Sequence, residues 1–360
     1  MAEARSIEGL SVTFTAGVAA GAWLSGIFPW GFPGLLLPLI GLPLLLRNAL
    51  SRADKHLTTK LFLGLFLLLG LFCYLSASAP SVRGPLPWER WAEEAACALR
   101  QTIDAIPFRN EGSAPLVKAL LTGDRSGLSP EVVAAFRRSG ASHILALSGL
   151  HIGILYLMAD RLTRLAGRSR PVRYLRFGLI VSAAGFFTLM TGAGPSIVRA
   201  FLFIVIREIQ ALGGRPGKPV RVLCLALLVQ LVLDPGVITS TGFQLSYLAM
   251  AGIFLLYPVL ESWYPRSFRW DPVRKVWSLA ALSISCQLFT GPLAWLRFHS
   301  FPRHFLLTNL LALPLTTGVM TAAIATVVLW SLGICPDGWV RLTDSLCRLL
   351  TQTLAIIAGL

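Results

Sequence analysis

Long apolar stretches separated by short polar segments recur along the whole chain. They lie near residues 10–29, 32–46, 60–78, 141–160, 177–192, 195–212, 221–234, 241–260, 277–297, 305–333 and 341–360. Most approach the roughly 17–25 residues that a helix needs to cross a hydrocarbon core about 30 Å thick. Several are short or interrupted by Pro and Gly, which membrane helices tolerate only where the backbone is buried in protein or lines a wet cavity. The pattern predicts an all-α polytopic membrane protein with about 10–11 transmembrane or re-entrant helices.

The same pattern divides the chain into 1–78, 79–113 and 114–360. In the first part, transmembrane helices carry a small-residue stripe, Gly17, Gly21 and Ser25, of the kind that lets helices approach closely. The second part holds a short amphipathic helix, "WERWAEEAACALRQTIDAI". Its apolar face consists of Trp88, Trp91, Ala95, Leu99, Ile103 and Ile106. We expect this helix either to lie flat on the outer membrane surface or to pack against neighbouring spans.

Composition and charge support a membrane protein rather than a nucleic-acid-binding surface. Hydrophobic residues make up 55% of the chain and charged residues 14%, and the formal net charge is +15. Of the 32 Lys and Arg residues, 18 fall in four loops, 47–60, 161–176, 207–221 and 266–275. Because cytoplasmic loops are enriched in Lys and Arg, these loops and the amino terminus are predicted to lie inside. Residues 79–140 and the turns at 192–195, 234–241 and 298–304 are predicted to lie outside.

Several familiar kinds of chemistry lack their motifs. The six cysteines are scattered without a CxxC pair or a histidine at ligand spacing, so we expect neither a disulfide framework nor a metal site, and no cofactor. The loop "GGRPGKP" departs from the nucleotide-binding pattern at both its first glycine and its final Ser or Thr. The energy for any translocation is therefore expected to come from a partner or a gradient.

The segment "GASHILALSGLHIGILYLMADRL" carries an unusual polar load for an apolar span. On one helix Ser148 and His151 would be neighbours, and His143 would lie about 80° round from His151. A serine beside a histidine suggests a nucleophile and base, but no acid lies nearby and "ALSGL" is not a nucleophile elbow. Two histidines also make a weak metal site. Hydrogen bonds to neighbouring helices and a polar path through the protein remain as alternatives.

Just before this segment, "SPEVVAAFRRSG" predicts a helix too short to span a membrane. Ser129 is its expected N-cap, Pro130 its first residue, and Gly140 follows its end. Such a helix suits a re-entrant or gating element, or a simple loop helix.

Two further polar groups enter apolar segments. "TGAGPSIVRAFLF" places Pro195 at a helix start and Arg199 about one turn inside it. An intramembrane Arg needs a partner or water, so Arg199 either extends to the outer headgroups or faces a hydrated lumen where it meets an anion. In "DPGVITSTGFQLSYLAMAG", Asp234 ends one span, and Gln244 and Tyr247 share a face of the next. Ordinary interhelical hydrogen bonds would also explain these residues.

These stretches resemble the ComEC-type competence proteins, the inner-membrane channels for DNA uptake in natural transformation. The matching stretches are "LLTGDRSGLSPEVVAAFRRSGASHILALSGLHIG", "TGAGPSIVRAFLF" and "LDPGVITSTGFQLSYLAMAGI", with a weaker match in "QLFTGPLAWLRFHSFPRHFLLTNLLALPLTT". The resemblance implies that 114–360 is a competence-type channel domain through which one DNA strand passes. Carried over position by position, the motif residues are His143, Ser148, Gly149, His151, Ser196, Arg199, Asp234, Gly242, Phe243, Gln244 and Ser246.

The resemblance also implies partners and a location. Single-stranded DNA would be the transported partner, with a DNA receptor outside the membrane, a cytosolic ATPase or helicase motor, a separate nuclease, and the bacterial cytoplasmic membrane as the site of action. The chain departs from fuller family members, because 79–140 is too short and helical for an OB-fold-like domain and no HxHxDH pattern supports a metallo-β-lactamase-like domain. We therefore expect the membrane channel alone, not an enzyme, without a natural tail after "TQTLAIIAGL". An intramembrane serine hydrolase and a small-solute transporter are the alternative functions.

Overall fold

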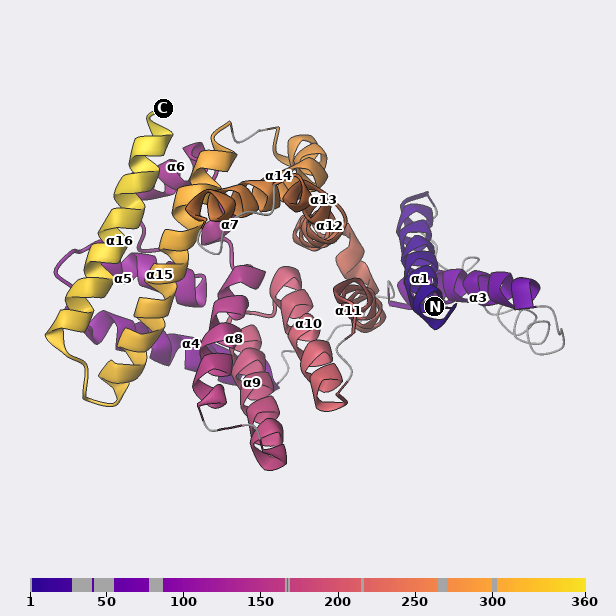
Figure 1. Ribbon diagram of the computed structural model, residues 1–360, viewed down its shortest axis with the longest axis horizontal. Helices are drawn as coiled ribbons and strands as arrows, with labels where there is room; N and C mark the ends of the chain where they lie inside the picture. The colour runs from indigo at the N-terminus through magenta and orange to yellow at the C-terminus, as the bar shows by residue number, and fades with distance from the viewer. Residues whose placement is uncertain are drawn as a thin grey trace. The chain divides into compact units, whose positions relative to one another are not determined.

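The computed structural model describes residues 2–27, 41, 55–77, 87–165, 167, 169–214, 217–264, 271–299 and 303–360 (Figure 1). Every regular element in these ranges is a helix. Within the described residues, five stretches are long and apolar enough to cross a membrane, namely Ile7–Ser25, Arg170–Met190, Thr241–Ser262, Pro272–Phe298 and Phe305–Ser331. The prediction of an all-α polytopic membrane protein is confirmed. Apart from residue 41, the expected span at 32–46 lies outside the described residues.

The chain forms two compact units. One comprises Met1–Gly84 and Leu202–Gln244, and the other comprises Pro85–Phe201 and Leu245–Leu360. The helices α10 (Pro195–Leu212) and α12 (Thr241–Leu255) each contribute residues to both.

The first unit is built on a close pair of long helices, α1 (Ala2–Ile27) and α3 (Lys55–Ala77). Its other elements are α11 (Pro219–Leu233) and the short 3-10 helix η1 (Pro235–Thr239). Gly17 packs directly on the carbonyl of Leu67, and a Cβ at Gly21 would lie 2.9 Å from Cβ of Tyr74. The small-residue stripe therefore serves the close approach of the two helices, as the sequence indicates.

The second unit contains the remaining helices. They are α4 (Pro87–Ala105), α5 (Ser113–Thr122), α6 (Pro130–Arg138), α7 (Ser142–Leu145), α8 (Gly149–Arg164), α9 (Arg170–Met190), α13 (Tyr257–Ser262), α14 (Pro272–Phe298), α15 (Phe305–Ser331) and α16 (Asp337–Ala358). Their core is a cluster of buried side chains from α5, α8, α15 and α16, with Leu116, Ile154, Val319 and Leu350 among its members.

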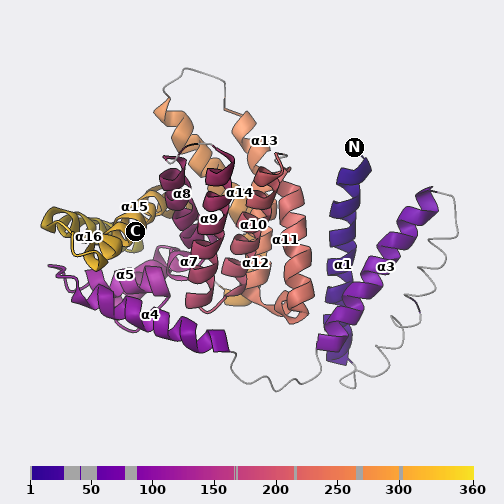
Figure 2. The same ribbon diagram turned by 90° about the horizontal axis from the view of Figure 1, so that it is seen from below.

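The amphipathic helix α4 packs against α5, α9 and α15, and Figure 2 shows it running below α5 and the lower end of α9. Its buried side chains are Ala92, Ala96 and Ile103, whereas Trp88 and Trp91 are 39% and 48% exposed. The sequence-based face was therefore wrong at its amino-terminal end, because two small alanines allow closer packing than two indoles. Trp91 contacts the rest of the unit through an edge-to-face pair with Phe186, at 5.4 Å between ring centroids. The contacts with α5, α9 and α15 agree with packing against neighbouring helices, and a position on the outer membrane surface stays a prediction.

The short helix α6 begins as predicted. Ser129 accepts a hydrogen bond from the N–H of Val132, Pro130 is the first helical residue, and Gly140 after the helix has φ +83°. These are the signals of an N-cap and of a glycine-permitted turn. The helix packs on α16 and α7, with Phe136 buried.

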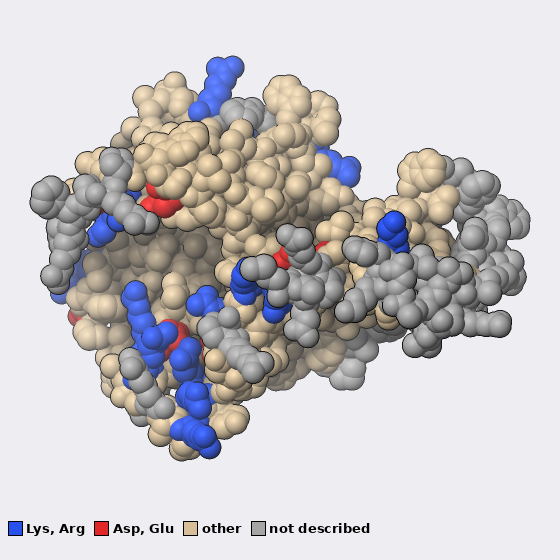
Figure 3. All heavy atoms as spheres, turned by 45° about the vertical axis from the view of Figure 1, so that its right-hand side comes forward, with Lys and Arg blue, Asp and Glu red and all other residues tan. Residues whose placement is uncertain are grey.

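An ion pair holds the far end of α8 to α9. The carboxylate of Asp160, which is buried, lies 2.7 Å from Nε of Arg164 and 2.6 Å from an Nη of Arg176. Arg161, Arg170 and Arg173 are exposed around this loop. Figure 3 shows a group of Lys and Arg side chains at the lower left of the visible surface, with others spread over the rest of it.

A second buried carboxylate joins α16 to the start of α5. Asp344, 3% exposed, accepts hydrogen bonds from the hydroxyl of Ser113 at 2.6 Å and from the N–H of Asn110 at 3.2 Å. Arg348, one turn further along α16, lies 3.5 Å from its other oxygen. The first turn of α5 is thereby fixed to the carboxyl-terminal helix.

Candidate functional site

The polar segment does not form the single helix that its hydrophobicity predicts. Helix α7 ends at Leu145, the backbone is extended at Ala146 and Ser148, and α8 begins at Gly149. The expected span at 141–160 is therefore wrong. The physical reason is Ser148, because a serine hydroxyl can satisfy a free backbone N–H at a helix start and so favours a new beginning over continuation.

Ser148 and His151 together close the first turn of α8. The N–H of Leu150 donates to Oγ of Ser148 at 3.3 Å, and the N–H of Ser148 donates to Nδ1 of His151 at 3.3 Å. This reciprocal arrangement is a capping box with histidine in the place usually taken by Glu or Gln. Since Nδ1 accepts a hydrogen bond, a neutral imidazole carries its proton on Nε2.

The Nε2 atom of His151 has no protein partner. The residue is 0% exposed, and Nε2 makes no hydrogen bond within the part of the chain that the structure describes. An N–H left unpaired in a buried position costs about 1–3 kcal/mol relative to a paired one. This atom is therefore suited to donate to a water molecule or to an anionic oxygen.

His143 does not join this arrangement. It lies on α7, is exposed, and its Nδ1 donates to the carbonyl of Gly140 at 3.1 Å. The expectation of a strip shared by His143, Ser148 and His151 on one helix is wrong, because the helix is interrupted between α7 and α8 and the two histidines lie on different helices. Ser148 and His151 do remain neighbours.

Arg199 meets the amino terminus of α8 at Gly149. A Cβ at Gly149 would lie 2.9 Å from an Nη of Arg199 and 3.3 Å from Cβ of Ala200. Only a residue without a side chain leaves the guanidinium its present position. The structure thus brings together two sequence-predicted residues, Gly149 of α8 and Arg199 of α10.

The guanidinium of Arg199 is enclosed by protein. The residue is 8% exposed, its Cζ lies 6.0 Å from the ring centroid of Tyr247 on α12, and its Nε has no hydrogen-bond partner in the described ranges. A cation over an aromatic ring is attracted to the ring face, but that contact does not use the N–H donors. This burial disfavours extension to the lipid headgroups and leaves a donor for an anion or water.

The remaining predicted residues occupy other positions. Ser196, half-buried, lies in the first turn of α10, and Ser246, also half-buried, lies on α12. Asp234 caps the end of α11 and is exposed, Gly242 is exposed, and Phe243 is 4% exposed. Gln244 donates from Nε2 to the carbonyl of Ile238 in η1 at 2.8 Å. That bond ties α12 to η1, which is the structural role that the sequence left open for Gln244.

The sequence did not identify three residues, namely the aromatic neighbour of Arg199 and two residues of α15 with unpaired side-chain oxygens in the described part of the chain. Tyr247 was noted only as sharing a face with Gln244, and nothing in the sequence relates an aromatic ring to a cation 48 positions away. Asn309 and Thr316 on α15 each have a buried side-chain oxygen without a partner among the described residues. Their seven-residue spacing, two helical turns, is the signal that could have paired them on one face. Helix α15 packs against α8.

Within the described ranges, no group of three or more His, Cys, Asp or Glu side chains is placed to hold a metal ion. The six cysteines are free thiols. What the region offers is a buried cation beside a half-buried helix amino terminus and, on the same helix, a buried N–H donor. These groups stabilise negative charge.

The chain has relatives of known family. A family model described as "Competence protein" matches residues 120–360. The chain is 26% identical over 280 residues to the "Uncharacterized protein YcaI" of Escherichia coli, covering 69% of this chain and 36% of that protein. It is 28% identical over 221 residues to "ComE operon protein 3" of Bacillus subtilis, covering 61% of this chain and 27% of that protein. It is also 28% identical over 214 residues to "Recombination protein 2" of Haemophilus influenzae, covering 56% and 26%. The chain thus spans about a quarter to a third of the length of these relatives. No solved structure matches it.

Proposed function

The chain belongs to the competence protein family, and we propose that it acts in DNA uptake by passing single-stranded DNA across the bacterial cytoplasmic membrane. The proposed path runs along the buried polar groups at the start of α8 and α10. Competence is named in a relative from Neisseria gonorrhoeae, "Competence protein ComA", which is 28% identical over 212 residues. The family therefore supports the general role, and the site supports the chemistry of the cargo.

One observation carries the proposal, the buried Arg199 with an unpaired Nε beside the first residue of α8. A guanidinium offers five N–H donors in a planar fork that fits a phosphate through two parallel hydrogen bonds. The dipole of helix α8 adds a partial positive charge of about half an elementary charge at its amino terminus. A DNA strand carries one negative charge per nucleotide. The site thus supplies positive charge and hydrogen-bond donors that can replace the water around a phosphate.

Three further buried polar atoms belong to the proposed path. Nε2 of His151 on α8 and the side-chain oxygens of Asn309 and Thr316 on α15 are buried without partners in the described part of the chain. Buried polar atoms of this kind are usually hydrogen-bonded, either to protein or to ordered water. Water and the base edges of a passing strand would satisfy both the donor and the acceptors.

We assign the driving force and the preparation of the strand to other proteins. A receptor would hold DNA outside the membrane, a cytosolic ATPase or helicase would pull the strand, and a separate nuclease would remove its complement. The channel needs neither a catalytic residue nor a metal or cofactor. Its hydrated path only lowers the cost of moving charge through the bilayer.

A second candidate function, intramembrane hydrolysis, is favoured by one distance. Oγ of Ser148 lies 3.2 Å from Nδ1 of His151. That nitrogen also accepts the backbone N–H of Ser148, and Nε2 lacks the carboxylate that would orient a catalytic imidazole. We therefore favour the capping role. Labelling of Ser148 by a serine-reactive fluorophosphonate would reverse this preference.

The test is uptake of fluorescently labelled DNA by cells that lack their own competence channel and express this protein. We expect Arg199→Ala to block cytoplasmic arrival at normal protein abundance, while DNA still binds to the cell surface. Arg199→Lys should retain part of the activity, because it keeps the charge but loses the planar fork. Arg207, exposed two turns further along α10, provides the matched control Arg207→Ala. Normal uptake by Arg199→Ala would refute the proposal.

A further inference from the structure

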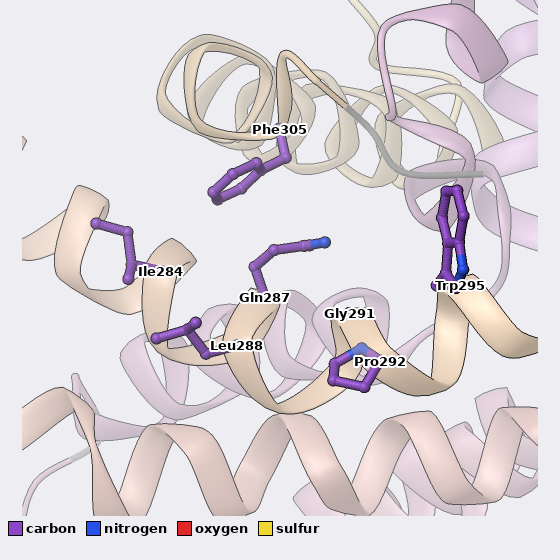
Figure 4. A pocket seen from close by; sticks show the side chains of 7 residues that line it. All are labelled: Ile284, Gln287, Leu288, Gly291, Pro292, Trp295 and Phe305. Atoms are coloured by element: carbon purple, nitrogen blue, oxygen red, sulfur yellow. The ribbon is translucent and has the colours of Figure 1, made fainter. Parts of the chain in front are cut away.

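A pocket of about 570 Å³ between α14 and α15 contains none of the charged groups of the proposed path. Figure 4 shows its lining, which is apolar except for the amide of Gln287 and the indole N–H of Trp295. A phosphate is held best by charged donors, and this lining has none. The residues that hold the start of α8 lie instead in the loop that follows α5.

The loop between α5 and α6 contacts the end of α7 through Arg125. The Nε and one Nη of Arg125 donate to the carbonyl oxygen of Leu145 at 3.1 and 2.8 Å. Leu145 is the last residue of α7, where carbonyls have no partner within the helix. In the same peptide unit, the N–H of Ala146 donates to the carbonyl of Ser142 at 3.1 Å. Because both polar groups of this unit are bonded, the direction in which the chain leaves α7 is fixed.

The bond to Leu145 competes with a continuous helix. In an α-helix the carbonyl of Leu145 would accept the N–H of Gly149, four residues further on. Arg125 occupies that carbonyl with two donors, and the backbone at Ala146 and Ser148 is extended instead. Ser148 favours a new helix start through local chemistry. Arg125 adds a tertiary contact that favours the same interruption.

The loop that carries Arg125 is itself held in place. One carboxylate oxygen of Asp124 accepts the N–H and the hydroxyl of Ser126 at 3.0 and 2.6 Å, as in other turns built on aspartate. Its other oxygen lies 3.8 Å from Nε of Arg100 on α4. The N–H of Leu128 donates to the carbonyl of Arg125 at 3.1 Å. The guanidinium of Arg125 therefore extends from a fixed backbone.

A second contact joins the same loop to the connection between α7 and α8. A Cβ at Gly123 would lie 2.6 Å from Cδ1 of Leu147, so only glycine allows this approach. The loop thus contacts the connection on both sides of Ala146, at the carbonyl of Leu145 and at the side chain of Leu147.

The amino terminus of α8 follows directly after this connection. Ser148 caps it, and Gly149 lies against an Nη of Arg199. The other end of α8 is bound to α9 through Asp160. Loss of the bonds from Arg125 would therefore leave the far end of α8 in place and free its first turn to move away from Arg199.

We propose that Arg125 is a positioning residue, which binds the carbonyl of Leu145, keeps α7 and α8 separate and so holds the amino terminus of α8 against Arg199. This inference rests on the proposed function, because the site that Arg125 positions is the one assigned to the DNA strand. Arg125 is exposed, so direct contact with the strand is the competing role. The two roles differ in what they predict for the protein without DNA.

The first measurement is disulfide trapping between α8 and α10 in the absence of DNA. A Cβ at Gly149 would lie 3.3 Å from Cβ of Ala200, close to the separation of about 3.5–4.5 Å in disulfides. Gly149→Cys and Ala200→Cys are combined in the purified protein in bilayer nanodiscs, and the oxidised peptide pair is identified by mass spectrometry. We expect Arg125→Ala to slow this disulfide about tenfold, because two bonds from a charged donor are lost. Arg125→Lys should slow it less, since an ammonium also donates to a carbonyl.

A reference pair shows whether the rest of the unit is unchanged. The hydroxyl oxygens of Thr326 on α15 and Thr343 on α16 lie 2.7 Å apart. A disulfide between Thr326→Cys and Thr343→Cys should therefore form at the same rate with Arg125 and with Arg125→Ala, and the melting temperature should stay the same. Arg90→Ala removes another exposed arginine, on α4, and should leave both disulfides unaffected.

The second measurement is uptake of labelled DNA by the protein with its native residues at 149 and 200. Arg125→Ala should lower cytoplasmic arrival about tenfold, while binding of DNA to the cell surface is unchanged. Arg125→Lys should retain part of the uptake and Arg90→Ala all of it.

Three results would overturn the proposal. An unchanged rate of the 149–200 disulfide in Arg125→Ala would show that Arg125 does not hold α8 and would favour direct contact with the strand. Equal slowing of the reference pair, with a lower melting temperature, would show that Arg125 only stabilises the fold. Slowing of the 149–200 disulfide alone, with normal uptake, would show that the position of α8 does not matter for passage. Normal uptake by Arg199→Ala would instead refute the proposed function, and the disulfide rates, measured without DNA, would still decide whether Arg125 positions α8.

Discussion

The contact between Gly149 and Arg199 allows a test of whether the position of the Arg199 guanidinium matters for DNA passage or only for the stability of the fold. Alanine at position 149 would place its Cβ 2.9 Å from an Nη of Arg199, and ordinary contacts begin at 3.4 Å. The guanidinium must therefore move by about 0.5 Å. Because the atom displaced is the far end of a flexible side chain, the fold can accommodate the change.

The expected effects on stability and on passage differ in size. Replacing a helical glycine by alanine stabilises a helix by up to about 1 kcal/mol, which offsets the crowding, so we expect the free energy of unfolding to change by no more than about 1 kcal/mol. A displacement of 1 Å in a positioned group can cost about a hundredfold in function. For about half that displacement we expect roughly tenfold less cytoplasmic DNA.

The assay compares Gly149→Ala with Gly153→Ala in labelled DNA uptake at equal protein abundance. Gly153 lies one turn further along α8, and a Cβ there would have no atom within 4 Å. It therefore controls for the helix propensity of alanine without touching Arg199. Equal uptake by the two variants, with equal melting temperatures, would refute the argument that the position of the guanidinium matters.

Three other expectations follow. In intact cells a membrane-impermeant maleimide should label Cys97, which is exposed on α4, and should not label a cysteine introduced at Arg173. The reverse result would invert the predicted topology. Asp344→Asn should lower the free energy of unfolding of the purified protein by about 1.5–3 kcal/mol, because a charged acceptor of two hydrogen bonds is lost. Asp337 is exposed on the same helix, so Asp337→Asn should change the free energy of unfolding by less than about 0.5 kcal/mol. His151→Ala should reduce DNA arrival in the cytoplasm without reducing surface binding, and a loss confined to protein abundance would show that His151 serves only the cap.

Much of the fold could be predicted because local chemistry decides it. The bounds 195–212 predicted for one apolar segment are those of α10, since Pro195 at the first position and the glycines before it favour a helix start. Ser129 and Pro130 define the start of α6 for the same reason. Hydrophobic length alone also located α14 and α15 closely.

The break between α7 and α8 was hidden because two local tendencies compete there. The run of Ile, Leu and Ala favours a continuous helix, whereas Ser148 can cap a new one, and hydropathy does not register the second tendency. The partners of Arg199 are even harder to predict from the sequence, since Gly149 and Tyr247 lie about 50 positions away on either side. Such pairs depend on helix packing, which periodicity along a single helix does not reveal.

The ion pair at the end of α8 limits how the protein could open. Asp160 attaches α8 to α9 through Arg176, and turning α8 about its axis would pull this buried carboxylate away from that arginine. Separating such a charge from its partners is expensive. Helices α8 and α9 should therefore move as one rigid body, and any opening that admits a strand should come from hinging of α7 and α10 around that body, at the extended residues 146–148 and the glycine-containing turn 191–194. Cross-linking α8 to α9 should then leave uptake intact, whereas restraining either of those two short connections should stop it.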